Sequence, residues 1–135
     1  MSYRFRVALL LIPVLLIAFL QSCKDEKEEE ITPAQQAEIY YNMLAKGQYE
    51  DFVHGTYGCD SLPGEYLCQR IDLLAQHVRM EQGKRKGYVS FKALSDEELS
   101  DTEHLVYLEV TFGDSTRERI ACPLILKDGR WLMRN

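Results

Sequence analysis

The sequence lacks the short motifs that mark most catalytic sites. It contains no Gly-x-Ser-x-Gly elbow, no glycine loop that would cradle a phosphate and no dinucleotide fingerprint. It also lacks Cys-x-x-Cys and His-Glu-x-x-His, and its histidines, His54, His77 and His104, show no metal-ligand spacing. From motifs alone we therefore predict no metal, no cofactor and no catalytic residue.

Long apolar runs are scarce as well, and the sequence has one, Val7–Leu20. Its 14 residues include Pro13, which makes it short for a bilayer span of roughly 20 residues. It follows the basic residues Arg4 and Arg6 and ends in small polar residues. This order is typical of a secretory signal peptide, which would end at Ser22.

The residues that close this run are Leu20, Gln21, Ser22 and Cys23. They resemble the lipobox of bacterial lipoproteins, where an aliphatic residue lies three positions before a cysteine. The resemblance implies that the chain is cut before Cys23, and that Cys23 carries a diacylglyceryl group and an acylated terminus. Three acyl chains would hold such a protein on a membrane. The alternative is an uncut signal anchor, which the position of the cysteine disfavours.

Acidic residues outnumber basic ones in the mature chain that would remain after the signal peptide is removed. The predicted signal carries two of the 16 Lys and Arg and none of the 21 Asp and Glu, so the mature 113 residues hold 14 basic and 21 acidic residues, a net charge of −7. This length suits one domain. Nucleic acid and anionic lipid repel an acidic domain, so we exclude both as partners.

No apolar residue occurs in the segment 24–30, which we predict to be a solvated tether. One interpretation is a charged spacer between the lipid and the domain. The other is a signal for export to the cell surface, since Cys-Lys-Asp-Glu resembles the export signal of Bacteroidetes surface lipoproteins. We thus predict a signal peptide over 1–22, an acylated cysteine and tether over 23–32, and a domain over 33–135. The predicted location is the outer membrane, on its periplasmic face or at the cell surface.

The first half of the domain has helical periodicity. Thr32, Pro33 and Gln35 form a capping-box start, and Gly47 is a stop signal. A short turn over 48–53 follows. The inward residues of the first helix, at three- and four-residue spacing, are Ala37, Tyr40, Tyr41 and Leu44.

A second long helix is predicted from Pro63 to about Gln82, before the basic cluster 84–86. Its apolar residues recur at the spacing of one helix face. They are Leu67, Ile71, Leu74 and Val78.

From Tyr88 the periodicity changes to two, the period of a strand. We expect Val89, Phe91 and Ala93 to face inward in a first strand, followed by a polar connection over 95–101. Two alternating strands and the Asp128-Gly129 hairpin complete a four-stranded meander. The predicted fold class is α+β, with two to three N-terminal helices packed on a curved four-stranded antiparallel sheet.

The end of the chain resembles a known superfamily. The segments 106–114, Val-Tyr-Leu-Glu-Val-Thr-Phe-Gly-Asp, and 123–133, Pro-Leu-Ile-Leu-Lys-Asp-Gly-Arg-Trp-Leu-Met, resemble the close of nuclear transport factor 2-like (cystatin-like) lipoprotein domains of unknown function. Leu132 and Met133 depart from the usual lysine and isoleucine. The resemblance covers Pro33 to Arg134. It implies a cone-shaped sheet whose mouth can hold a small ligand, with no assigned activity.

Cys59 and Cys68 are candidates for a disulfide in an oxidising envelope, which would stabilise the domain by roughly 2–3 kcal/mol. The alternative is two buried free thiols. Cys122 lies at an inward strand position, so we expect a free core thiol there.

Catalytic members of the superfamily build sites from Asp, His and Tyr residues in the cone. In this chain Tyr41, His54, Tyr107 and Glu109 are the candidates for a shared pocket. Our leading hypothesis is a non-enzymatic envelope lipoprotein that binds a small ligand or a protein partner. The alternatives are an envelope isomerase or hydrolase with a polar pocket, and a structural accessory subunit.

Overall fold

The computed structural model describes residues 30–134. The predicted signal peptide, Cys23 and most of the predicted tether lie outside the described residues. The chain divides into two units, Met1–Ile31 and Thr32–Asn135, and the second contains all the elements discussed below. Within the described residues, none of the helices combines the length and the apolar character that a membrane crossing requires.

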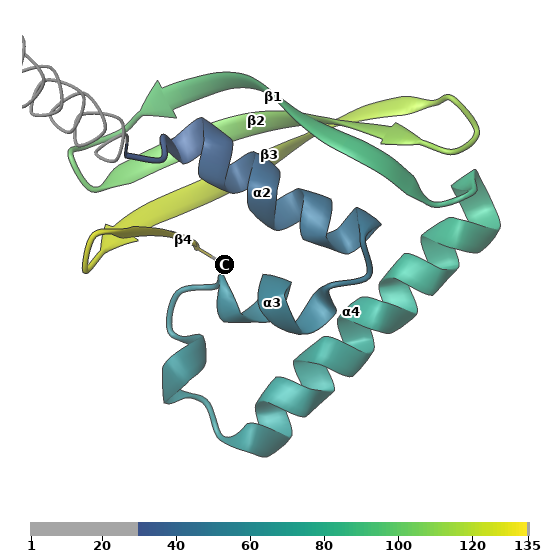
Figure 1. Ribbon diagram of the computed structural model, residues 1–135, viewed down its shortest axis with the longest axis horizontal. Helices are drawn as coiled ribbons and strands as arrows, with labels where there is room; N and C mark the ends of the chain where they lie inside the picture. Colours follow the sequence, from purple (N-terminus) through teal and green to yellow (C-terminus); the bar gives the residue numbers. More distant parts are fainter. Residues whose placement is uncertain (1–29, 135) are drawn as a thin grey trace, which may run out of the picture. The chain divides into compact units, whose positions relative to one another are not determined.

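The described part is an α+β domain, as predicted. Three α-helices pack on one antiparallel sheet with strand order β1-β2-β3-β4. Figure 1 shows α2 lying against the sheet and α4 running from the loop after η1 back to the start of β1. The elements are α2 Pro33–Ala45, α3 Tyr49–His54, the 3-10 turn η1 Cys59–Ser61, α4 Gly64–Arg85, β1 Tyr88–Glu98, β2 Glu103–Phe112, β3 Arg117–Lys127 and β4 Arg130–Met133.

Helix α2 begins at the predicted capping box. The Gln35 backbone N–H donates to Thr32 Oγ1 at 3.2 Å, and the Thr32 N–H donates to Gln35 Oε1 at 3.0 Å. These two bonds satisfy amides that the first helical turn leaves unpaired. The helix then buries Ala37, Tyr40 and Leu44 against the sheet.

The centre of the core lies on β2, whose even-numbered residues are buried from Val106 to Phe112. This alternation is the predicted one, because successive strand residues point to opposite faces. The residues that complete the core around Val106 and Leu108 are Ala37, Tyr40, Cys122, Leu124 and Met133.

The first strand differs from its prediction in two places. Tyr88 pairs with Phe112 but Ser90 pairs with Thr111, so Val89 is an extra residue in a β-bulge. The bulge turns Val89 to solvent, and the Tyr88 ring packs inward instead, 5.5 Å from the Phe112 ring. The prediction that Val89 faces inward is therefore wrong.

β1 also runs on to Glu98, through most of the predicted polar connection. Glu97 pairs with Leu105 and Glu98 with His104. Backbone pairing needs no apolar side chains, which is why the polar sequence gives no sign of this extension. A second bulge between Ala93 and Ser95 lies where the strand leaves the core.

Helix α4 confirms the predicted second helix and extends it to Arg85. None of its 22 residues is fully buried. The predicted inward residues Leu67, Ile71, Leu74 and Val78 are all half-buried. The helix lies over the sheet without closing on it, which leaves a space between them.

The loop after α3 is held by the last strand. The Tyr57 N–H donates to the Met133 carbonyl at 2.7 Å, and the Met133 N–H donates to the Gly55 carbonyl at 2.8 Å. Thr56 and Met133 thus form a parallel bridge beside the sheet. Gly55 is required here because a Cβ would lie 2.5 Å from the Tyr40 ring. The backbone before η1 is therefore fixed against the sheet.

Candidate functional site

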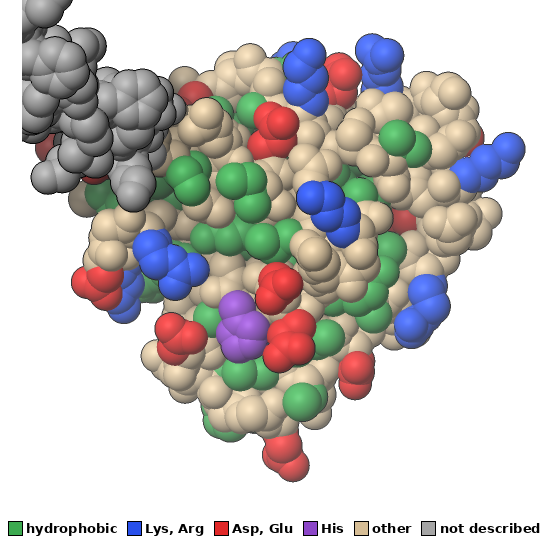
Figure 2. All heavy atoms as spheres, in the orientation of Figure 1, with side chains coloured by type: hydrophobic (Ala, Val, Ile, Leu, Met, Phe, Trp, Pro, Cys, Tyr) green, Lys and Arg blue, Asp and Glu red, His purple; other side chains and the backbone are tan. Residues whose placement is uncertain are grey.

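A cavity of about 400 Å³ lies between helix α4, helices α2 and α3, and the sheet. Its volume falls within the range of small-molecule sites, about 300–1,000 Å³. Figure 2 shows hydrophobic side chains reaching the surface over the helical layer, among charged ones. The hydrophobic side chains that line the cavity are Tyr41, Leu44, Phe52, Leu74, Phe91, Val110, Phe112 and Ile120.

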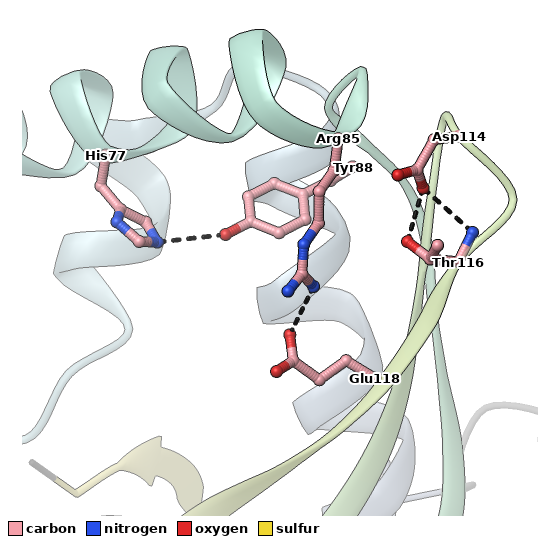
Figure 3. Close-up of polar contacts among 6 residues, drawn as sticks. All are labelled: His77, Arg85, Tyr88, Asp114, Thr116 and Glu118. Carbon is pink, nitrogen blue, oxygen red and sulfur yellow. Dashed lines mark hydrogen bonds and ion pairs between the residues drawn. The ribbon is translucent and has the colours of Figure 1, made fainter.

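The mouth of this cavity is polar. His77 and Glu81 come from α4, Tyr88 from β1 and Glu118 from β3. The Tyr88 hydroxyl lies 3.2 Å from His77 Nε2 (Figure 3). Glu81 Oε2 is buried, and it has no hydrogen-bond partner among the described residues. Burying a carboxylate oxygen without a hydrogen-bond partner costs free energy. A hydrogen bond from a ligand donor to this atom would therefore stabilise a complex more than one to an exposed group.

Arg85 lies beside this mouth. Its Nη1 is 3.0 Å from Glu118 Oε2, and its guanidinium carbon lies 4.6 Å from the centre of the Phe112 ring. Figure 3 shows the side chain reaching from the end of α4 past Tyr88 to Glu118. Both partners of the ion pair are substantially exposed. The pair therefore stabilises the fold by about 0–1 kcal/mol, and a competing cation could displace it.

Two tyrosines of the cavity hold their protons firmly. Burial raises the pKa of Tyr41 to about 12, with smaller contributions from Cys122 and Tyr88. Burial also raises the pKa of Tyr88, and the nearby Glu81 and Glu118 carboxylates add to the effect. At neutral pH both hydroxyls are protonated, so they can donate and accept hydrogen bonds but cannot act as bases.

The four residues predicted to share a pocket do not meet. Tyr41 lines the cavity, whereas His54 lies at the end of α3 and lines a different hollow. Tyr107 and Glu109 alternate with the buried residues of β2, so they lie on the opposite face of the sheet, where Glu109 is 3.6 Å from Arg117. The prediction that these four residues share one pocket is therefore wrong, because the helices cover the face of the sheet opposite to Tyr107 and Glu109.

Sequence reasoning missed the residues of the mouth. The helical period places His77 and Glu81 in line with Leu74, and the strand period places Glu118 in line with Ile120. Both signals were available in the sequence. Tyr88 was not predictable in this way, because the bulge at Val89 decides its direction.

All three cysteines of the described part are free thiols. The Cys59 thiol is buried and donates to the His54 carbonyl at 3.4 Å, whereas Cys68 is exposed on α4. The structure therefore contains free thiols rather than the disulfide, and only one of the pair is buried. Cys122 is a buried core thiol, as its strand position predicts, and burial raises its pKa to about 12.

The hollow beside His54 is a second feature. It also has a volume of about 400 Å³, and its walls are mostly polar. Three of its residues carry potential metal-ligand atoms that lie within 4.8 Å of one another: His54, Cys59 and Asp60. Their spacing matches no familiar motif, so the sequence gives no warning of this cluster.

No protein-family model matches the sequence, and no curated protein matches it. Among solved structures, it is similar to a Campylobacter jejuni protein described as a "putative NTF2-like transpeptidase". The TM-score is 0.62 at 13% sequence identity, and the match covers 77% of this chain and 98% of the other. The described domain therefore has the nuclear transport factor 2-like fold.

Proposed function

We propose that this protein is a lipid-anchored lipoprotein of the outer membrane whose domain binds a small molecule and does not catalyse a reaction. The observation that carries the proposal is the cavity beneath α4, which combines an apolar interior with a polar mouth. Such a combination suits a ligand with an apolar body and one polar end.

The charges at the mouth favour a cation as that polar end. Glu81 and Glu118 contribute two carboxylates, and the buried Oε2 of Glu81 lacks a donor among the described residues. Aromatic rings in the cavity wall can add to the attraction. The Phe112 face already carries the Arg85 guanidinium, so an ammonium group would use the other rings unless Arg85 moves. An ammonium group could donate to Glu81 while Arg85 stays with Glu118 or moves away. We therefore propose an organic amine as the ligand class.

Binding fits the groups at the cavity better than group transfer does. A transpeptidase, the activity that the Campylobacter protein's description names, needs an activated nucleophile beside a base. The hydroxyl groups that line this cavity belong to Tyr41 and Tyr88, and burial raises the pKa of both. They are suited to hydrogen bonding with a bound molecule rather than to attack on it.

The proposed anchor rests on the lipobox-like residues that end at Cys23. Acylation at Cys23 would keep the domain at the membrane surface, joined by a tether rich in acidic residues. The ligand would then be a small molecule of the envelope or of the medium. The charged segment after Cys23 also fits export to the cell surface, as in the Bacteroidetes lipoproteins that it resembles.

Three compounds with one apolar body test the ligand class: phenylbutylamine, phenylbutanol and phenylbutanoate. We would follow the backbone amide shifts of Phe91 and Phe112, which lie at the cavity. The amine should bind at least about tenfold more tightly than the carboxylate, since a hydrogen bond to a charged group contributes about 1.5–3 kcal/mol. Glu81→Gln should remove much of this preference.

A matched pair of variants tests the cavity itself. Leu74→Trp places a large side chain into the cavity, whereas Leu73→Trp places the same side chain on the 65% exposed neighbour. Binding should be lost in the first and retained in the second. If none of the three compounds shifts the cavity amides, or if Leu74→Trp binds the amine normally, the proposed function is wrong.

A further inference from the structure

We propose that His54, Cys59 and Asp60 form a binding site for a zinc-type divalent cation. The site is separate from the cavity beneath α4 and shares no residue with it. It rests on the juxtaposition of one nitrogen, one sulfur and one oxygen donor at the edge of a hollow. These are the three donor types that zinc accepts in proteins.

The distances are close to those that zinc needs. The three donor atoms lie within 4.8 Å of one another, and Cys59 Sγ is 3.6 Å from Asp60 Oδ1. Zinc bonds of about 2.0–2.3 Å in a tetrahedron place neighbouring ligand atoms about 3.5 Å apart. The sulfur–oxygen distance already fits. His54 and Asp60 are both exposed, so small rotations of their side chains would complete the geometry.

The backbone that carries the ligands is fixed. His54 ends α3, and Cys59 and Asp60 belong to η1. Between them the chain is bonded to Met133 of β4 through Gly55 and Tyr57. Gly58, with φ 81°, makes the left-handed step that starts η1. A site whose ligands lie on anchored backbone loses little conformational entropy on binding.

Cys59 is the central ligand, because it is buried while the other two are exposed. Its sulfur lies 3.6 Å from Asp60 Oδ1, so a buried sulfur donor and a carboxylate oxygen are already side by side. A dication would bind Cys59 as the thiolate, and the thiol proton would be released to solvent.

Residues around the three ligands provide a neighbouring carboxylate for His54 and leave a fourth coordination position open. His54 Nε2 lies 3.8 Å from Glu50 Oε1, an ion-pair distance that is longer than a hydrogen bond. A small movement of either exposed side chain would let Glu50 orient the imidazole, with Nδ1 as the coordinating nitrogen. The fourth position faces the hollow, whose wall includes the cations Lys127 and Arg130. Water or a small anion would complete the tetrahedron there.

Cobalt substitution tests the site directly. The full chain carrying Cys23→Ser and Cys68→Ser, purified in detergent, would be titrated with Co²⁺ while absorbance is recorded. We expect the near-ultraviolet charge-transfer band of a thiolate bound to cobalt, reaching saturation at one equivalent and disappearing when Zn²⁺ is added. Because Cys68 is exposed and outside the cluster, its replacement also serves as the matched cysteine control.

Variants of the ligands decide the outcome. Cys59→Ser should abolish the band, and His54→Gln and Asp60→Asn should each weaken zinc affinity by more than the roughly tenfold loss expected for Glu50→Gln. His77→Gln should leave the zinc affinity unchanged.

Because Cys59 is buried, Cys59→Ser could unfold the domain. In that case the variants at the two exposed positions, His54 and Asp60, decide the test. If the band is absent, or if His54→Gln and Asp60→Asn both bind normally, the proposal fails. The amine titration above is independent of this result.

Discussion

Asn42 of α2 and Phe91 of β1 exchange two hydrogen bonds, as if the side chain were a neighbouring strand. Asn42 Nδ2 donates to the Phe91 carbonyl at 3.0 Å, and the Phe91 N–H donates to Asn42 Oδ1 at 3.0 Å. Glu38 Oε2 accepts from the Ala93 N–H at 3.1 Å. Since β1 is an edge strand, its outward backbone groups would otherwise be open to pairing with another chain. Helix α2 thus covers the edge and positions Phe91 in the cavity wall.

Replacing Asn42 should destabilise the domain. Asn42→Ala leaves the Phe91 N–H and carbonyl partly buried without partners, so we expect a loss of about 1–3 kcal/mol in the free energy of unfolding. Asn42→Asp keeps an acceptor for the N–H and should lose less. Urea denaturation followed by circular dichroism measures both. Equal stability of Asn42→Ala and the unaltered chain would show that the helix does not depend on this contact.

How much of this structure the sequence predicts depends on how local each feature is. The start of α2 was predictable because Thr32 and Gln35 are three residues apart, and β2 was predictable because its own residues alternate. The position of Tyr107 relative to the cavity was not, because it depends on which face of the sheet the helices cover. The approach of His54 to Cys59 likewise depends on the bridge between Thr56 and Met133. Such contacts between distant segments leave no periodic pattern.

The bulge in β1 can be tested by comparing substitutions at Val89 and Tyr88. Val89→Lys should change the free energy of unfolding by no more than about 0.5 kcal/mol, because Val89 is 59% exposed. Tyr88→Lys should be much more harmful, since the Tyr88 ring packs 5.2 Å from Phe91 and 5.5 Å from Phe112. Thermal unfolding of the two variants gives the comparison. The opposite order of stability would mean that the strand has the regular register that the alternation predicts.

The lipid anchor gives a prediction about the segment outside the described residues. In a lipoprotein-processing host, the unaltered chain should incorporate radioactive palmitate and be recovered with membranes. Cys23→Ser should incorporate none, whereas Cys68→Ser should be labelled normally, because the lipobox resemblance concerns Cys23 alone. Labelling of Cys23→Ser would contradict the anchor. It would leave the cavity and the metal site untouched, since both lie within the domain.

Stability should fall at alkaline pH through Tyr41. Burial raises the pKa of Tyr41 from 10.0 to about 12 in the folded state. Below pH 10 the hydroxyl is protonated in both states, so its contribution is constant. Between pH 10 and 12 the unfolded chain releases this proton and the folded domain retains it, so the free energy of unfolding falls by roughly 3 kcal/mol in all.

Tyr41→Phe should remove the part of this loss in the free energy of unfolding that comes from Tyr41. The part due to the buried thiol of Cys122 should remain, because burial raises the pKa of that thiol from 9.0 to about 12. Tyr66→Phe is the matched control, since Tyr66 is 59% exposed on α4 and its loss removes no buried hydroxyl. Urea denaturation midpoints at several pH values from 8 to 12, measured with a reducing agent, supply the profile. If Tyr41→Phe loses stability over this range as steeply as the unaltered chain, the Tyr41 hydroxyl is not buried as the structure has it, and the cavity wall must be open to water at this point.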